Sequence, residues 1–232
     1  MIRIDQLTKR YGRTLAVDRL SFTVPPGQVT GFLGANGAGK STTLRAILGL
    51  DRPTSGHALV HDRPYPSYRH PLSVVGAALD ASATHDGLRA RTHLLALARS
   101  NGIAARRVDA VLDEVGLGNV AQRRVRALSL GMKQRLAIGA ALLGDPEALL
   151  FDEPLNGLDP EGIRWFRALA ARLAGEGRAV LISSHLMSEM ARTADRVVII
   201  GQGRLLAEEP LAELGPSLED AYVRLTEGAT HV

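Results

Sequence analysis

The chain has 232 residues and a formal net charge of +4, a length that fits one large α/β domain or a core with one inserted subdomain. It contains no cysteine, which excludes disulfides and thiolate metal sites. Its basic residues are dispersed among acidic ones and its longest small and apolar run, residues 136–144, is too short to cross a bilayer, so we expect a soluble chain that binds no nucleic acid.

The N-terminal region reads as a small sheet. Residues 1–33 alternate apolar and polar positions and are divided by turns at Tyr11-Gly12 and Pro25-Pro26-Gly27. This pattern predicts short, partly antiparallel strands. Residues 55–62 predict a further strand that returns to the same sheet, so the chain is expected to begin with an antiparallel β subdomain.

A glycine-rich segment, GANGAGKST at residues 34–42, follows an apolar run and leads into a helical pattern. A strand, such a loop and a helix in this order are typical of a phosphate-binding loop. The glycines let successive N–H groups point at an anion, and the helix adds the positive end of its dipole. Lys40 supplies a positive charge for the β- and γ-phosphates, and the Ser41 hydroxyl can ligate Mg²⁺. The predicted phosphate-binding residues are Gly34, Ala35, Asn36, Gly37, Ala38, Gly39, Lys40, Ser41 and Thr42.

The pattern changes between residues 72 and 144. Residues 93–99, 106–115 and 132–143 show helical spacing of Leu, Val and Ile, without a strong strand between them. This predicts a helical subdomain over residues 72–144, inserted into an α/β core made of residues 1–71 and 145–232.

The core resumes with three apolar runs at residues 148–151, 179–183 and 197–200, separated by helical segments such as 163–174. Continuous apolar runs alternating with helices predict a mostly parallel, buried sheet. Together with the phosphate loop, this predicts the α/β fold of a P-loop NTPase.

Three polar side chains follow two of these runs, at the sheet edge where the phosphate loop also lies. Asp152 can hold Mg²⁺ directly or through water, and Glu153 can polarise the water that attacks the γ-phosphate. His185 follows the second run, and its imidazole can hydrogen-bond the γ-phosphate and orient the same water. We therefore predict Lys40, Glu153 and His185 as catalytic residues.

These motifs together resemble the ATP-binding cassette (ABC) ATPases over nearly the whole chain. Residues 128–134, LSLGMKQ, resemble the signature motif of that family, whose common form is LSGGQ; Leu130 replaces a usual Gly, and Met132 a usual Gln. Ser129, Gly131 and a helix N-terminus would form a second anion site. The signature of the family contacts the γ-phosphate bound to the opposite subunit. The resemblance therefore implies a head-to-tail dimer, with itself or with a homologous ATPase, that encloses ATP.

The resemblance also implies roles for three other residues. Tyr11 matches the aromatic residue that stacks on adenine. Asp159, in the segment NGLD, matches the loop that connects the two sites across the dimer, although it could equally just cap the next helix. Asp80 stands where the family has Gln, or Glu in some exporter branches. We hypothesise that Asp80 still serves the metal, with altered geometry because its side chain is shorter.

The resemblance implies an ATPase subunit that drives a separate membrane permease from the cytoplasmic face of the plasma membrane. The surroundings of Asp80 and the variant signature are most similar to the drug and antibiotic exporter branch, which suggests export of a hydrophobic compound or a peptide. Because few residues follow Tyr222, we expect no extra C-terminal regulatory domain. Two alternatives stay open: a non-transport cassette ATPase, and a nucleotide-gated regulatory module with little turnover.

Overall fold

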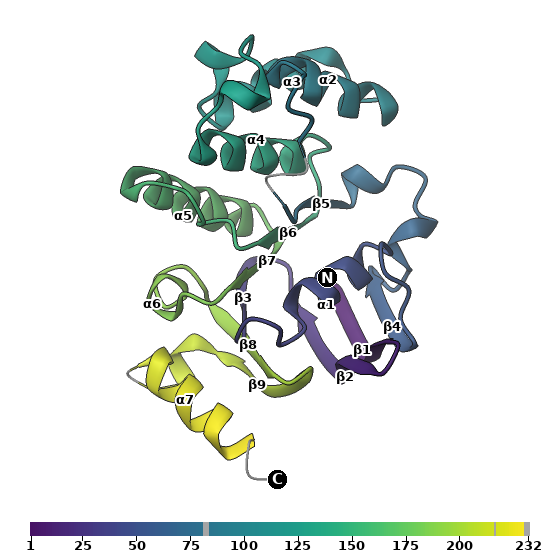
Figure 1. Cartoon of the computed structure of the whole chain (residues 1–232), viewed down its shortest axis with the longest axis vertical. Coiled ribbons are helices and arrows are strands. Elements are labelled where there is room, and N and C mark those ends of the chain that lie inside the picture. Colours follow the sequence, from purple (N-terminus) through teal and green to yellow (C-terminus); the bar gives the residue numbers. More distant parts are fainter. Residues whose placement is uncertain (81–83, 216, 230–232) are drawn as a thin grey trace.

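The computed structural model describes residues 1–80, 84–215 and 217–229, which form two sheets and the helices around them (Figure 1). The smaller sheet is antiparallel, with strand order β2-β1-β4, and consists of β1 (Ile2–Tyr11), β2 (Thr14–Val24) and β4 (Ser55–Val60). The antiparallel N-terminal sheet predicted from the alternating pattern is thus confirmed, and its first two strands are longer than expected.

The larger sheet has the strand order β5-β6-β7-β3-β8-β9. Its strands are β3 (Gln28–Leu33), β5 (Val75–Ala78), β6 (Ala148–Asp152), β7 (Ala179–Ser184), β8 (Arg196–Gly201) and β9 (Arg204–Pro210). All neighbouring strands pair in parallel except β8 and β9, which are antiparallel. Every residue of β7 is buried, as expected for a strand covered on both faces. The mostly parallel core is confirmed.

Helices cover both faces of the larger sheet. The structure describes the helices α1 (Lys40–Ile47), α2 (Ala90–Ser100), α3 (Ala105–Glu114), α4 (Leu130–Leu142), α5 (Pro160–Gly175), α6 (Met187–Met190) and α7 (Leu218–Ala229). Of these, α2 and α3 pack on each other and on α4. Short 3₁₀ turns lie at Tyr65–Ser67, Pro71–Ser73, Gly118–Val120, Val125–Ala127 and Leu211–Glu213. Within the described ranges, we find no helix with the length and apolar character that a membrane span requires.

The helical region begins later in the chain than predicted. Helices α2, α3 and α4 gather at the top of Figure 1, but β5 joins the core sheet by pairing in parallel with β6. Residues 75–78, which the prediction assigned to the helical region, thus form a strand of the core sheet. The strand is short and made of small residues, so it gives little periodicity. At Gly76 a Cβ would lie 1.8 Å from the Ala141 carbonyl oxygen, so α4 packs directly on this strand.

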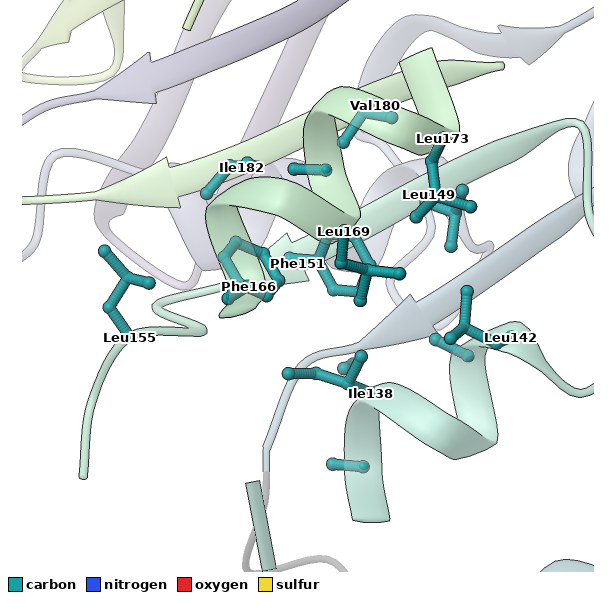
Figure 2. Close-up of a cluster of buried hydrophobic side chains, with 14 of the residues drawn as sticks. Ile138, Leu142, Leu149, Phe151, Leu155, Phe166, Leu169, Leu173, Val180 and Ile182 are labelled. Carbon is teal, nitrogen blue, oxygen red and sulfur yellow. The ribbon is translucent and has the colours of Figure 1, made fainter. Parts of the chain in front are cut away.

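Side chains alternate between two hydrophobic clusters on the opposite faces of the sheet. Leu149 and Phe151 of β6 join the cluster that contains α4 and α5, and Figure 2 shows Ile138 of α4 in this cluster. Phe151 packs edge-to-face on Phe166 of α5, with ring centroids 5.2 Å apart. Leu150 points to the opposite cluster, which joins α1 and the small sheet. The two-residue repeat of a strand therefore ties the helical region and the small sheet to one central layer.

Candidate nucleotide-binding site

The glycine-rich loop between β3 and α1 packs tightly against its neighbours. A Cβ on Gly39 would lie 2.6 Å from the Ala16 carbonyl oxygen, and one on Gly34 would lie 2.8 Å from the Ile200 carbonyl oxygen. Gly39 also has φ of +104°, and Gly37, at +81°, has open space around it. Gly34 and Gly39 are required for close backbone approach, and Gly37 for its backbone angle.

Lys40, the first residue of α1, is buried beside this loop. Its Nζ donates to the carbonyl oxygens of Gly34 at 2.6 Å and Ala35 at 3.2 Å. Burial lowers the pKa of Lys40, and the nearby carboxylates of Glu153 and Asp152 oppose this effect. An amine that has lost much of its hydration and stands at a helix N-terminus is suited to an anionic ligand.

The loop and the end of β6 enclose a cavity of about 200 Å³. Its lining residues are Ala16, Asn36, Gly37, Gly39, Lys40, Ser41, Thr42, Asp152 and Glu153. Positive charge, backbone N–H groups, a hydroxyl and two carboxylates therefore face the same small space. A larger cavity of about 630 Å³ lies on the other side of the loop, toward β9 and α7, and the predicted catalytic residues do not line it.

Glu153 stands between the two other predicted catalytic side chains. Its Oε1 is 3.9 Å from Lys40 Nζ, and its Oε2 is 2.9 Å from His185 Nδ1. The backbone of Glu153 has φ of +48°, a left-handed conformation that costs a non-glycine residue roughly 1–2 kcal/mol. The ends of β6 and β7 and the start of α1 thus bring together Lys40, Glu153 and His185.

The buried Ser183 of β7 contacts both acidic residues. Its hydroxyl donates to Asp152 Oδ1, and its Oγ accepts a hydrogen bond from the Glu153 N–H at 3.1 Å. Sequence reasoning missed this residue. The available signal was a polar side chain in an apolar run, on the strand that precedes His185.

Tyr11 lies at the end of β1, outside the set of residues that line the 200 Å³ cavity. Its hydroxyl donates to Asp51 Oδ2 at 2.7 Å, and the residue as a whole remains 45% exposed. Lys9 Nζ lies 4.8 Å from the ring centroid. Burial of the hydroxyl, with the hydrogen bond to Asp51, raises the pKa of Tyr11. The ring is therefore held at its polar end and has an accessible face.

Ser129 and Asp159 both cap helices and do not line the cavity. Ser129 Oγ accepts from the Met132 N–H at 3.3 Å at the start of α4. Asp159 Oδ1 accepts from the Gly162 N–H at 2.7 Å at the start of α5. Asp159 thus caps the helix that follows it, which was one of the two roles considered for this residue.

Gly131 lies close to the loop that contains Asp159. A Cβ on Gly131 would be 2.9 Å from the Gly157 carbonyl oxygen. The predicted signature and the segment after the Asp-Glu pair are therefore packed together within one chain, away from the cavity that the phosphate loop lines.

Asp80 is exposed and follows β5, the strand next to β6. Parallel strands end at the same edge, so Asp80 and Asp152 belong to one side of the sheet. Among the residues that the structure describes, no group of three or more histidine or carboxylate side chains is gathered as a metal site. Ser41 and Asp152, two of the predicted metal ligands, both line the 200 Å³ cavity, and the oxygen-bearing side chains of Asn36, Thr42 and Glu153 line it with them.

The parallel sheet, the loop between β3 and α1, and the paired acids at the end of β6 define a P-loop nucleoside triphosphatase. Residues 17–156 match the family described as ABC transporter. The chain belongs to the ABC transporter family, and it is an ATP-binding subunit and an ATPase of that family.

Two relatives and one solved structure illustrate the match. The bacitracin transport ATP-binding protein BcrA of Bacillus licheniformis is 43% identical over 217 residues, covering 92% of this chain and 71% of that protein. The lantibiotic transport ATP-binding protein SrtF of Streptococcus pyogenes is 35% identical, covering 90% of both chains. A dimeric structure of a bacterial ABC transporter cassette is 25% identical, with a TM-score of 0.82 and coverage of 91% of this chain and 99% of that one.

Proposed function

We propose that this chain powers a separate membrane permease that exports a peptide or a hydrophobic antibiotic, with Glu153 as the base for ATP hydrolysis. The observation that carries the proposal is the position of Glu153 between Lys40 and His185, beside the cavity of the phosphate loop. A carboxylate that faces a phosphate-binding lysine on one side and an imidazole on the other is suited to polarise an attacking water.

Each charged group has a distinct task in this mechanism. Lys40 and the loop N–H groups hold the β- and γ-phosphates. Glu153 takes up the proton of the attacking water as the γ-phosphoryl group leaves. His185 is hydrogen-bonded to Glu153 through Nδ1 and keeps that carboxylate oriented. When both ring nitrogens carry a proton, the Nε2–H can also donate a hydrogen bond to the γ-phosphate. Electrostatic positioning supplies most of the catalysis in phosphoryl transfer.

Mg²⁺ fits the donors that face the cavity, because hydroxyl and carboxylate oxygens are the ligands it prefers. Ser41 and Asp152 would hold the ion. When bound, the ion would neutralise charge on the β- and γ-phosphates. We include Asp80 as a further ligand through the shared sheet edge, and Asp80→Ala tests this role: unchanged ATPase activity with unchanged Mg²⁺ dependence would remove it.

A second subunit completes the site in this proposal. Ser129 and Gly131 at the start of α4 would meet the γ-phosphate held by the partner, which is a second copy or a homologous ATPase. Tyr11 would stack on adenine, and Asp159 would contact the partner across the interface. The dimeric state of a similar cassette supports this assembly.

The names of two relatives support the substrate class that we propose. BcrA and SrtF are named for bacitracin and lantibiotic transport. We assign this chain to the same kind of transporter, bound to the cytoplasmic face of the plasma membrane through its permease. A non-transport ATPase would instead associate with ribosomes or DNA, and a regulatory module would bind ATP without turnover even with its permease.

The Glu153→Gln variant tests the mechanism, with Glu147→Gln as a matched control at the opposite end of the same strand. Glu147 pairs with His61 at 3.1 Å, outside the cavity. We expect Glu153→Gln to bind ATP but to lose at least about a hundredfold in turnover, the contribution of a positioned base. Glu147→Gln should retain turnover. Full activity of Glu153→Gln would remove Glu153 from its role.

A transport assay tests the substrate class. A strain that lacks this gene should become more sensitive to bacitracin or to a lantibiotic. The wild-type gene should restore resistance, and the Glu153→Gln gene should not. Equal resistance of the deletion strain and the parent to both peptide classes would contradict peptide export.

A further inference from the structure

We infer that Ser183 is a positioning residue for both acidic groups of the site: its buried hydroxyl orients the Asp152 carboxylate and fixes the backbone of Glu153. This inference rests on the proposed function, because it concerns the metal-holding and water-polarising roles assigned to those two residues. Ser183 itself does not line the cavity.

The position of Ser183 in the sheet places it beside both residues. Strand β7 lies between β6 and β3 (Figure 1), and Ser183 pairs in register with Asp152 and with Phe32. Its side chain is completely buried. A parallel strand covered on both faces normally holds apolar residues there. A buried hydroxyl is unfavourable unless it is fully hydrogen-bonded, so its contacts matter.

Both hydrogen-bonding capacities of the hydroxyl are used. The O–H donates to Asp152 Oδ1, and Oγ accepts from the Glu153 N–H at 3.1 Å. A serine hydroxyl can donate one hydrogen bond, so Asp152 Oδ1 accepts it and Oδ2 is left for another partner. The hydrogen bond from Ser183 thus makes the two oxygens of the Asp152 carboxylate different: Oδ1 is bonded to Ser183, and Oδ2 is the oxygen that we assign to the metal.

The second contact acts on Glu153. The N–H of Glu153 is shared between Ser183 Oγ and the Ser183 carbonyl oxygen, each at 3.1 Å. Glu153 has a φ of +48°, a left-handed backbone conformation that residues other than glycine rarely adopt. The shared hydrogen bond holds this conformation at the end of β6, and with it the direction in which the Glu153 side chain leaves toward Lys40 and His185.

Ser183→Thr and Ser183→Val form the central test, because the two side chains have nearly the same shape and differ in the hydroxyl. Binding of a non-hydrolysable ATP analogue is titrated with Mg²⁺, and turnover is measured separately. We expect Ser183→Val to raise the half-saturating Mg²⁺ concentration at least about tenfold, the usual effect of losing a residue that orients a metal ligand. Ser183→Thr should stay near wild type, and binding without Mg²⁺ should be equal in both.

Two further variants complete the experiment. Ser183→Ala removes the hydroxyl without adding bulk, and it should raise the half-saturating Mg²⁺ concentration as Ser183→Val does. It therefore provides the test even if the valine variant folds poorly. Ser184→Ala is the matched control, because Ser184 is equally buried but its Oγ accepts from the Leu186 N–H instead. Ser184→Ala should leave the Mg²⁺ titration unchanged.

The outcomes separate this inference from the proposed function. Equal Mg²⁺ titrations for the threonine, valine and alanine variants would overturn the role of Ser183 while wild-type turnover stays intact. A wild-type protein that neither binds nor hydrolyses ATP with Mg²⁺ would overturn the proposed function itself.

Discussion

Leu130 lies directly against Gly157: its Cγ and Cδ2 are each 2.5 Å from the position that a Cβ on Gly157 would occupy. Leu130 is the first residue of α4. Its side chain lies on the loop that contains Gly157 and is 62% exposed to solvent. The residue that departs from the usual glycine of the signature thus contacts the segment that follows Glu153. Its contact predicts a measurable energetic coupling.

Gly157→Ala should lose more stability than Gly177→Ala. Both glycines have positive φ, +78° and +86°, but Gly177 has open space around it. The left-handed backbone costs an alanine roughly 1–2 kcal/mol at either position. Crowding against Leu130 should add about 1 kcal/mol at Gly157, and this excess should disappear in the double variant with Leu130→Ala. Urea unfolding of the wild type, the three single variants and the double variant measures the coupling, and equal losses for Gly157→Ala and Gly177→Ala would refute it.

Ser129→Asp and Ser129→Asn should separate capping from phosphate contact. Both side chains cap helices as well as serine does, and the negative charge of Asp should add about 0.3–1 kcal/mol to stability at the N-terminus of α4. That same charge would repel a γ-phosphate. We therefore expect at least about tenfold lower turnover for Ser129→Asp than for Ser129→Asn, at equal or higher stability. Equal turnover would mean that Ser129 faces no phosphate.

Tyr11→Phe should bind ATP nearly as well as wild type, because it keeps the ring and loses only the hydrogen bond to Asp51. Tyr11→Ala removes the ring. Stacking of a base on an aromatic side chain contributes about 1–3 kcal/mol, so affinity should fall roughly 5- to 150-fold. Equilibrium binding of ATP measures the difference, and equal affinities of the two variants would show that adenine binds elsewhere.

The lowered pKa of Lys40 predicts how pH changes stability. Between that lowered pKa and the ordinary value of about 10.4, the unfolded chain holds a proton that the folded protein has released. The unfolded state then binds more protons, so the free energy of unfolding rises with pH. Wild type should therefore gain stability relative to Lys40→Met as pH rises toward 10.4, and the difference should be constant below the lowered pKa.

Urea unfolding without nucleotide at several pH values between 7 and 10 measures this effect. Lys133→Met serves as the control, since Lys133 pairs with Asp86 on the surface at 3.0 Å. A difference between wild type and Lys40→Met that does not change with pH would show that burial does not perturb the Lys40 amine.

Patterns that lie within a few consecutive residues could be predicted correctly. The apolar runs that became β6, β7 and β8 have the length and composition of strands buried on both faces. Strand β5 was missed because its residues, VGAA, are small and its position depends on the close approach of α4. The antiparallel strand β9 and helix α7 were also not predicted.

The phosphate loop and the paired acids can be predicted from the sequence, because glycine spacing and strand composition are local patterns. Which distant residues meet depends on the tertiary structure. The sheet order β5-β6-β7-β3-β8-β9 differs from the chain order, so Ser183 reaches Asp152 across 31 positions of sequence. A single buried hydroxyl has no periodic pattern of its own, and its role exists only where the neighbouring strand places its partners.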